Sequence, residues 1–100
     1  MRTTVVCLLL ILFNPLLGVG AEEANQVTFA VGCYDVGADA LKNRPGVLEV
    51  DKGWQRYDGF HFREVNRVRY DPQRVDVKRL EQWLKQADTW HATLPEQNEE

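Results

Sequence analysis

The chain has 100 residues, and its 12 Lys and Arg against 15 Asp and Glu give it a formal net charge of −3. This length fits one small domain. The mild acidity argues against a nucleic-acid binder, because such proteins normally present a basic face.

The N-terminal segment is typical of an export signal. One arginine precedes an apolar run from Val5 to Phe13, and a Pro/Gly break then leads to small residues up to Ala21. The run is shorter than the roughly 20 residues that span a bilayer. We therefore expect residues 1–21 to be cleaved and the protein to be exported, periplasmic or secreted, with no membrane contact after cleavage. Cys7 leaves with the signal, so Cys33 has no partner for an internal disulfide.

The rest of the chain alternates between strand-like and helix-like patterns. A β-branched apolar stretch ended by glycine predicts a strand, and a helical pattern stopped by Arg-Pro-Gly follows it. Two further strands are indicated by alternation, with the loop "KGWQRYDG" between them, and a second helix has Asp76 as its expected N-cap. Val75 and Leu80 are spaced for a hydrophobic staple across that cap. The predicted elements are residues 27–32, 34–43, 46–54, 60–72 and 75–87.

This order of elements predicts the fold class. A βαββα chain of this size favours an α+β domain, a small ferredoxin-like sandwich whose mixed or antiparallel sheet carries both helices on one face. We expect the domain to cover residues 22–90. Residues 91–100 are rich in polar side chains, and we expect them to form a disordered tail.

Two residues are candidates for chemistry. Cys33 would lie at the start of the first helix, where free N–H groups and the helix dipole favour the reactive thiolate, although Asp35 opposes a second negative charge. A small buried apolar residue is an equally good interpretation of this cysteine. Glu64 shares a strand face with Phe62 and Val68, so helices on that face would desolvate its carboxyl and favour a proton donor. An edge glutamate that reaches water is the alternative.

Two blocks of the sequence resemble a known family. "FAVGCYDVGADALKNRPGVLEVDKGW" resembles the opening of the A-type peptide methionine sulfoxide reductases, and "REVNRVRYDPQRVDVKRLEQWL" is similar to their His-Ala-Glu block with its Tyr-Asp-Pro turn and helix. The matching positions are Gly32-Cys33, Pro45-Gly46-Val47, Gly53-Trp54, Glu64 and Tyr70-Asp71-Pro72.

The resemblance implies an activity. Cys33 would attack the sulfoxide sulfur of an oxidised methionine in a peptide or protein, and Glu64 would protonate the oxygen. Independently of the resemblance, Tyr34, Trp54 and Tyr57 could line an apolar groove for the methionine-bearing substrate. The resemblance implies no cofactor or metal. Without a second cysteine, an external thiol reductant such as a thioredoxin-like protein would restore Cys33.

The chain also departs from the family pattern. It has Tyr34-Asp35 where the family has Phe-Trp, its loop between the two blocks is shorter, and it lacks the C-terminal segment that supplies an aspartate and a tyrosine.

Two alternatives remain. A module of the same fold could bind a methionine-bearing peptide through its aromatic residues without catalysis. Alternatively, "ALKNRPGVLEV" and "VRYDPQRVDVKRL" resemble heavy-metal-associated domains, which bind soft metals through Cys-x-x-Cys. Cys33 would match the second ligand of that motif, but Ala30 stands at the first.

Overall fold

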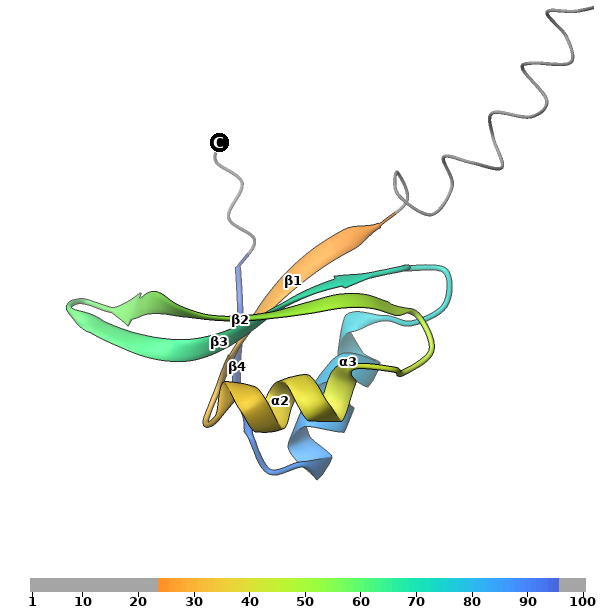
Figure 1. Ribbon diagram of the computed structural model, residues 1–100. Helices are drawn as coiled ribbons and strands as arrows, with labels where there is room; N and C mark the ends of the chain where they lie inside the picture. The colour runs from red at the N-terminus through yellow and green to blue at the C-terminus, as the bar shows by residue number, and fades with distance from the viewer. Residues whose placement is uncertain (1–23, 96–100) are drawn as a thin grey trace, which may run out of the picture.

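The computed structural model describes residues 24–95, which form one four-stranded sheet and two helices (Figure 1). The expected signal segment, residues 1–21, lies outside the described residues. The predicted α+β class is confirmed. The elements, in chain order, are β1 (Asn25–Val31), α2 (Tyr34–Leu41), β2 (Val47–Asp58), β3 (His61–Tyr70), α3 (Val77–Gln86) and β4 (Trp90–Leu94).

The strands lie in the order β2-β3-β1-β4, and all three neighbouring pairs are antiparallel. The sheet is therefore antiparallel rather than mixed. β1 and β2 run in the same direction with β3 between them, and α2 makes the connection, which is the split βαβ arrangement of ferredoxin-like folds. Among the described helices, none is long and apolar enough to cross a membrane.

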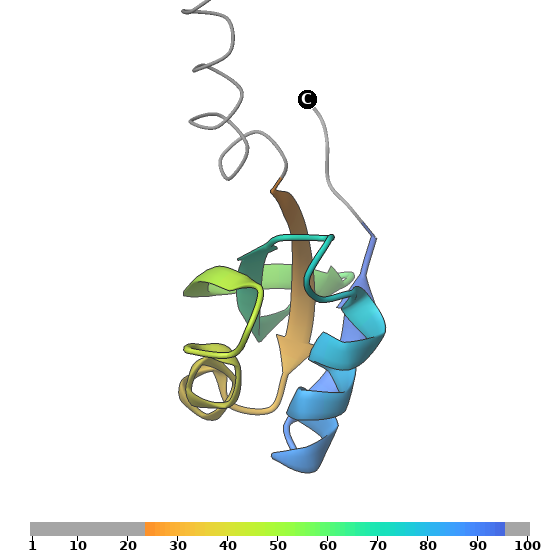
Figure 2. The same cartoon turned by 90° about the vertical axis from the view of Figure 1, so that its right-hand side faces the viewer.

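The helices and one sheet face enclose the core. α2 and α3 lie beside each other below the strands in Figure 1, and Figure 2 shows the pair from the side. Register places Val27 opposite Val68 and Phe29 opposite Asn66, so alternate residues of β1 and β3 point toward the helices. The buried cluster consists of Phe29, Val31, Leu41, Val68, Tyr70, Val75, Leu80 and Leu84.

The helix signals in the sequence hold. The Asp76 carboxylate accepts a hydrogen bond of 2.9 Å from Arg79 N, as expected of an N-cap. Val75 and Leu80, the expected staple residues, both lie in the core cluster.

The C-terminal prediction needs correction, because residues Trp90–Leu94 form a strand on the outer edge of β1. A disordered tail therefore cannot begin at residue 91. Five residues with a histidine and a threonine show little periodicity, and this strand is instead stabilised by its ladder with β1 and by side-chain bonds. Trp90 Nε1 donates to Thr93 Oγ1 at 3.1 Å, and Thr93 Oγ1 in turn donates to Glu81 of α3.

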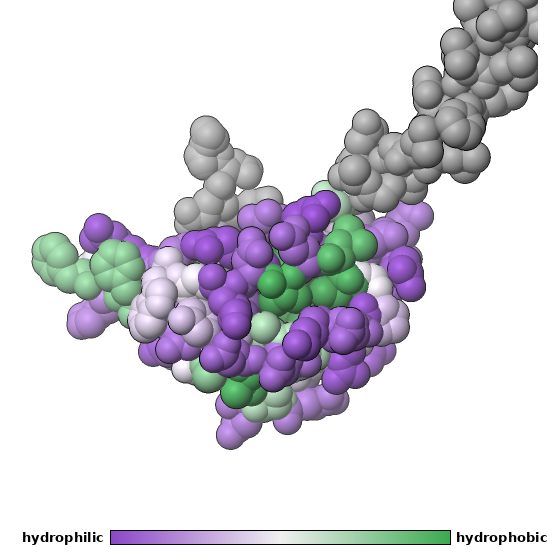
Figure 3. All heavy atoms as spheres, in the orientation of Figure 1, coloured by the Kyte–Doolittle hydropathy of each residue, from purple (hydrophilic) through white to green (hydrophobic). Residues whose placement is uncertain are grey.

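The predicted loop between the second and third strands is also wrong. β2 continues to Asp58 and pairs with β3 almost to the turn, where Gly59 adopts a φ of 55°. The resulting hairpin extends beyond the helices, so its end has no second layer (Figure 1). Aromatic side chains there are exposed, with Phe60 at 91% and Phe62 at 56%. The apolar atoms that protrude on the left of Figure 3 belong to this end.

Candidate functional site

The site begins at the junction of β1 and α2, where Cys33 is the N-cap residue with extended backbone angles of φ −144° and ψ 119°. Its side chain makes no capping bond, and the residue is partly buried. Cys33 N donates to Thr89 Oγ1 at 3.0 Å, and the same hydroxyl donates to Cys33 O at 3.3 Å. Gly32 N donates to Thr89 O at 2.8 Å. The residues that lead into α2 are thus held by one threonine.

Thr89 is itself fixed by the end of α3. Asp88 takes a left-handed φ of 61°, Thr89 N donates to Leu84 O, and Asp88 N donates to Lys85 O. This pair of bonds is the Schellman motif, with an aspartate in the position that glycine usually fills. Thr89 is 5% exposed, so its hydroxyl has protein partners in place of water. The end of one helix therefore positions the start of the other.

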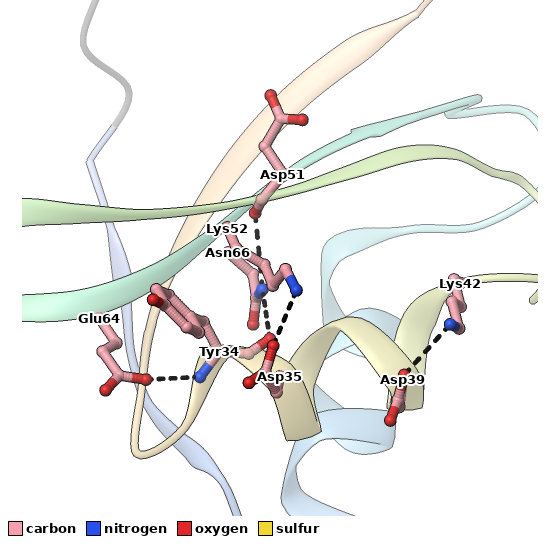
Figure 4. A network of polar contacts seen from close by, with 8 residues as sticks. All are labelled: Tyr34, Asp35, Asp39, Lys42, Asp51, Lys52, Glu64 and Asn66. Carbon is pink, nitrogen blue, oxygen red and sulfur yellow. Dashed lines mark hydrogen bonds and ion pairs between the residues drawn. The ribbon is translucent and has the colours of Figure 1, made fainter.

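Glu64 reaches the start of α2 from the middle of the sheet. Its Oε1 accepts a hydrogen bond of 2.8 Å from Tyr34 N, as Figure 4 shows. Standard backbone bond lengths then place this oxygen within about 6 Å of the Cys33 Cα. The carboxylate supplies the partner for a free helix N–H that the Cys33 side chain leaves unmet. The two expected catalytic residues are thus neighbours in the fold.

Asn66 lies one step further along the same face of β3, and sequence reasoning assigned it no role. It is fully buried, and its Nδ2 donates to Tyr34 O at 3.1 Å and to Asp51 O at 3.5 Å (Figure 4). A Cβ at Gly37 would lie 2.0 Å from Asn66 Oδ1. The signal in the sequence was an amide in the middle of an apolar strand face. Asn66 fixes the first turn of α2 against the sheet.

The negative charge of Asp35 has a partner in β2. Lys52 Nζ lies 2.8 Å from Asp35 Oδ1, and the ammonium lies 5.9 Å from the centre of the Tyr34 ring. The hydrogen bond and the charge of Asp35 raise the pKa of Lys52 above its usual value. The sequence alone predicts only that Asp35 opposes a negative charge on Cys33. In the fold, an ammonium group balances the charge of Asp35.

Two of the three expected substrate-contacting residues lie beside Glu64. Trp54 is directly opposite Glu64 in the β2–β3 ladder, and its ring meets that of Tyr34 edge to face at 6.1 Å. Trp54 is 57% exposed, so this aromatic pair faces solvent next to the carboxylate. The pair gives the site an apolar wall.

Tyr57 is the exception. It lies three residues beyond Trp54, and alternation points its ring to the sheet face without helices. There it meets the His91 ring at 5.3 Å, and the Arg63 guanidinium lies 5.6 Å from its centre. The structure therefore does not bring Tyr57 together with Tyr34 and Trp54.

The positions compared with the heavy-metal-associated motif, Ala30 and Cys33, lie in β1 and at the start of α2. Across residues 24–95, no group of three or more His, Cys, Asp or Glu side chains is placed to hold a metal ion. Ala30 is fully buried in β1, and His61 is exposed beside the hairpin turn, with Nδ1 3.2 Å from Asp58 O.

Fold and site together define a small ferredoxin-like α+β domain with a cysteine and a carboxyl group at the start of its first described helix. Comparisons with protein-family models, with curated proteins and with solved structures find no match to the chain.

Proposed function

We propose that this protein is an exported reductase of the peptide methionine sulfoxide reductase type, acting on oxidised methionine in peptides or proteins. The observation that supports the proposal is the hydrogen bond from Tyr34 N to Glu64 Oε1, because it brings an acid beside the residue that follows Cys33. Oxygen transfer from a sulfoxide uses a thiol as nucleophile and an acid as proton donor, and these two residues supply both groups.

The chemistry divides between two side chains. The Cys33 sulfur attacks the sulfoxide sulfur while Glu64 gives a proton to the sulfoxide oxygen. The oxygen then moves to the Cys33 sulfur as the substrate S–O bond and the transient S–S bond break, so that methionine leaves and Cys33 becomes a sulfenic acid. The proton lost by the Cys33 thiol replaces the one that Glu64 gave. Oε1 of Glu64 is engaged by Tyr34 N, which leaves Oε2 to carry the proton. The exposed Trp54 ring and the partly buried Tyr34 ring offer an apolar surface for the methyl group.

Recovery of the thiol needs electrons from outside. Among the described residues Cys33 is the only cysteine, so a first external thiol forms a mixed disulfide with it and releases water. A second thiol then releases Cys33 and forms the disulfide of the reductant. A thioredoxin-like protein or a small dithiol supplies both electrons.

The test is turnover of a methionine-(S)-sulfoxide peptide with excess dithiothreitol. Cys33→Ser is expected to abolish turnover. Glu64→Gln keeps an oxygen that accepts the bond from Tyr34 N but removes the acid, and we expect kcat to fall by about 100-fold or more. Glu49→Gln is the matched control, because it makes the same change at an exposed carboxylate of β2 that pairs with Arg69. Absence of turnover in the unaltered protein would refute the proposal.

A second function, binding of methionine-bearing peptides without catalysis, is favoured by the exposed aromatic residues of the hairpin. Trp54, Phe60 and Phe62 are each more than half exposed, and such clusters mark interaction sites. For this function a methionine peptide should bind the unaltered protein and the Cys33→Ser variant equally, with no product formed. Loss of binding in Cys33→Ser would refute it.

A further inference from the structure

A cavity of about 350 Å³ lies at the opposite end of α2 from Cys33, between the loop that follows α2 and the first turns of α3. Its volume is that of a small-molecule site. The lining residues are Pro45, Arg74, Val75, Asp76, Arg79 and Trp83.

The walls of this cavity are rigidly built. Gly46 has a φ of 88°, and a Cβ there would lie 2.7 Å from Val75 Cγ1, so the two loops are in close contact. Asp71 N donates to Gly46 O at 2.8 Å. Asp71 O accepts hydrogen bonds from Arg74 N and Val75 N, which closes the second loop into a turn. The backbone of the two loops is therefore held in place before any ligand arrives.

Two arginines line the cavity, and a third lies over the ring of its tryptophan. The Arg44 guanidinium lies 4.8 Å from the centre of the Trp83 ring, and that of Arg79 lies 6.0 Å from it. Arg44 Nε also donates to Ala40 O at 3.0 Å. A guanidinium held over an aromatic ring keeps the N–H groups on its edge available for a ligand. Arg74 adds a third cation from the loop before α3.

The charge around the cavity is unbalanced. Between residues 24 and 95, the ion pairs are Lys42–Asp39, Lys52–Asp35 and Arg69–Glu49, and none involves the three arginines. The one carboxylate in the lining, Asp76, uses Oδ1 as the cap of α3. The lining thus holds two cations and one anion that already has a structural role.

We propose that this cavity binds the phosphate group of a small phosphate ester. Guanidinium groups recognise tetrahedral oxyanions through paired N–H donors, and Arg74 and Arg79 supply these donors in the lining. The remaining volume, beside Pro45 and Val75, accommodates the organic part of the ester. A hydroxyl on that part would donate to Asp76, which makes a hydroxylated ester the better ligand.

The test is an NMR titration of the ¹⁵N-labelled protein with inorganic phosphate, at constant ionic strength maintained with chloride. The chain carries its own controls, because its three tryptophans lie in different places. The Trp83 indole N–H and the amides of Arg74 and Val75 are expected to shift, while the indole signals of Trp54 and Trp90 stay in place. Equal shifts of all three indoles, or none, would overturn the proposal.

Variants of the lining sharpen the test with effects of opposite sign. Arg79→Gln should weaken phosphate binding by about tenfold, as expected for the loss of one charged hydrogen-bond donor. Asp76→Asn keeps a good N-cap but removes the repelling charge, so it should tighten phosphate binding. Arg69→Gln is the matched control, because Arg69 of β3 pairs with Glu49 of the edge strand β2, and it should leave the affinity unchanged. An equal loss in Arg69→Gln and Arg79→Gln would show nonspecific charge attraction and overturn the site.

Glycerol 3-phosphate tests the rest of the ligand. It carries two hydroxyl groups and should bind more tightly than inorganic phosphate, with a smaller advantage in Asp76→Asn. Equal affinity for the two compounds would overturn the assignment to an ester.

Discussion

The two ends of the β2–β3 hairpin have the same backbone ladder but different surroundings. The end away from the turn, around Val50 and Val68, is covered by the helices and contributes to the core. The end with the turn, around Phe60 and Phe62, is not covered by the helices and exposes its aromatic rings. Both ends have apolar residues in their strands.

The difference shows that the helices, rather than the strand pattern, decide which apolar residues become core. α2 has eight residues and reaches about 12 Å along the sheet. β2 has 12 residues and extends well beyond it. Cys33 and Glu64 lie where this cover begins, so the candidate site is formed at the border between the packed and the open end.

The largest expected effect comes from replacing a phenylalanine with alanine in the core and comparing it with the same change at the open end. Phe29→Ala removes a fully buried ring from the core and should lower the free energy of unfolding by about 3–5 kcal/mol. Phe62→Ala removes a ring that is 56% exposed, and the change should stay within about 0.5 kcal/mol. Urea unfolding followed by circular dichroism measures both. Similar losses for the two variants would mean that the open end is packed as well as the covered one.

Two glycines provide the next comparison. A Cβ at Gly37 would meet the buried Asn66 Oδ1 at 2.0 Å, whereas one at Gly53 would meet Arg67 Nη1 at 2.5 Å. Asn66 can move only by losing its bonds to Tyr34 O and Asp51 O, while the Arg67 side chain can turn toward solvent. The gain in helix propensity offsets part of the cost, so we expect Gly37→Ala to destabilise by about 1–2 kcal/mol.

Gly53→Ala should cost less than Gly37→Ala, because only a flexible side chain has to move. Thermal unfolding of the two variants gives the comparison. A Gly37→Ala protein as stable as the unaltered one would show that Asn66 does not fix α2.

The third prediction concerns the hydrogen bonds between Thr89 and Cys33, which lie at the border between the covered and the open end. Thr89→Val keeps the shape but leaves Cys33 N without its acceptor, which should cost about 1–2 kcal/mol. Thr28→Val, the same change on β1, should stay within about 0.5 kcal/mol. The Cys33 amide signal in an NMR spectrum should also move in the Thr89 variant. If the Cys33 amide signal and the stability are both unchanged, Thr89 does not hold the start of α2 in place.

Much of the fold could be predicted because several local signals agreed. Arg44-Pro45-Gly46 ended a helix, Asp76 capped another, and alternation marked β1 and β3. β4 could not be predicted, because a five-residue strand owes its existence to the free edge of β1 rather than to its own pattern. The length of β2 was missed for a similar reason. Its outer half is a strand because β3 pairs with it, and its exposed residues resemble those of a loop.

The residues of the candidate site also differ in whether they could be predicted from the sequence. Cys33 and Glu64 could be selected from sequence because strand parity and the position after a strand are local properties. The contributions of Thr89 and Asn66 could not, since they depend on contacts across 56 and 32 positions of the chain. Tyr57 shows the limit of proximity in sequence, because three residues along a strand reverse the face and separate it from Trp54.

The smallest expected effect belongs to the ion pair at the border, and it depends on pH. Asp35 raises the pKa of Lys52 in the folded state, so the pair contributes its full stability below the unfolded value of about 10.4 and loses it as the pH rises through the folded value. Lys52→Gln should therefore reduce the alkaline loss of stability relative to the unaltered protein. Lys78→Gln, at an exposed position of α3, should not reduce this alkaline loss.

Both side chains of the Lys52–Asp35 pair are about half exposed or more, so 0.5 M salt should largely remove the difference between Lys52→Gln and the unaltered protein. Denaturant unfolding between pH 8 and pH 11 measures it, and identical pH profiles for Lys52→Gln and the unaltered protein would show that the pair contributes nothing to holding α2 at the open end.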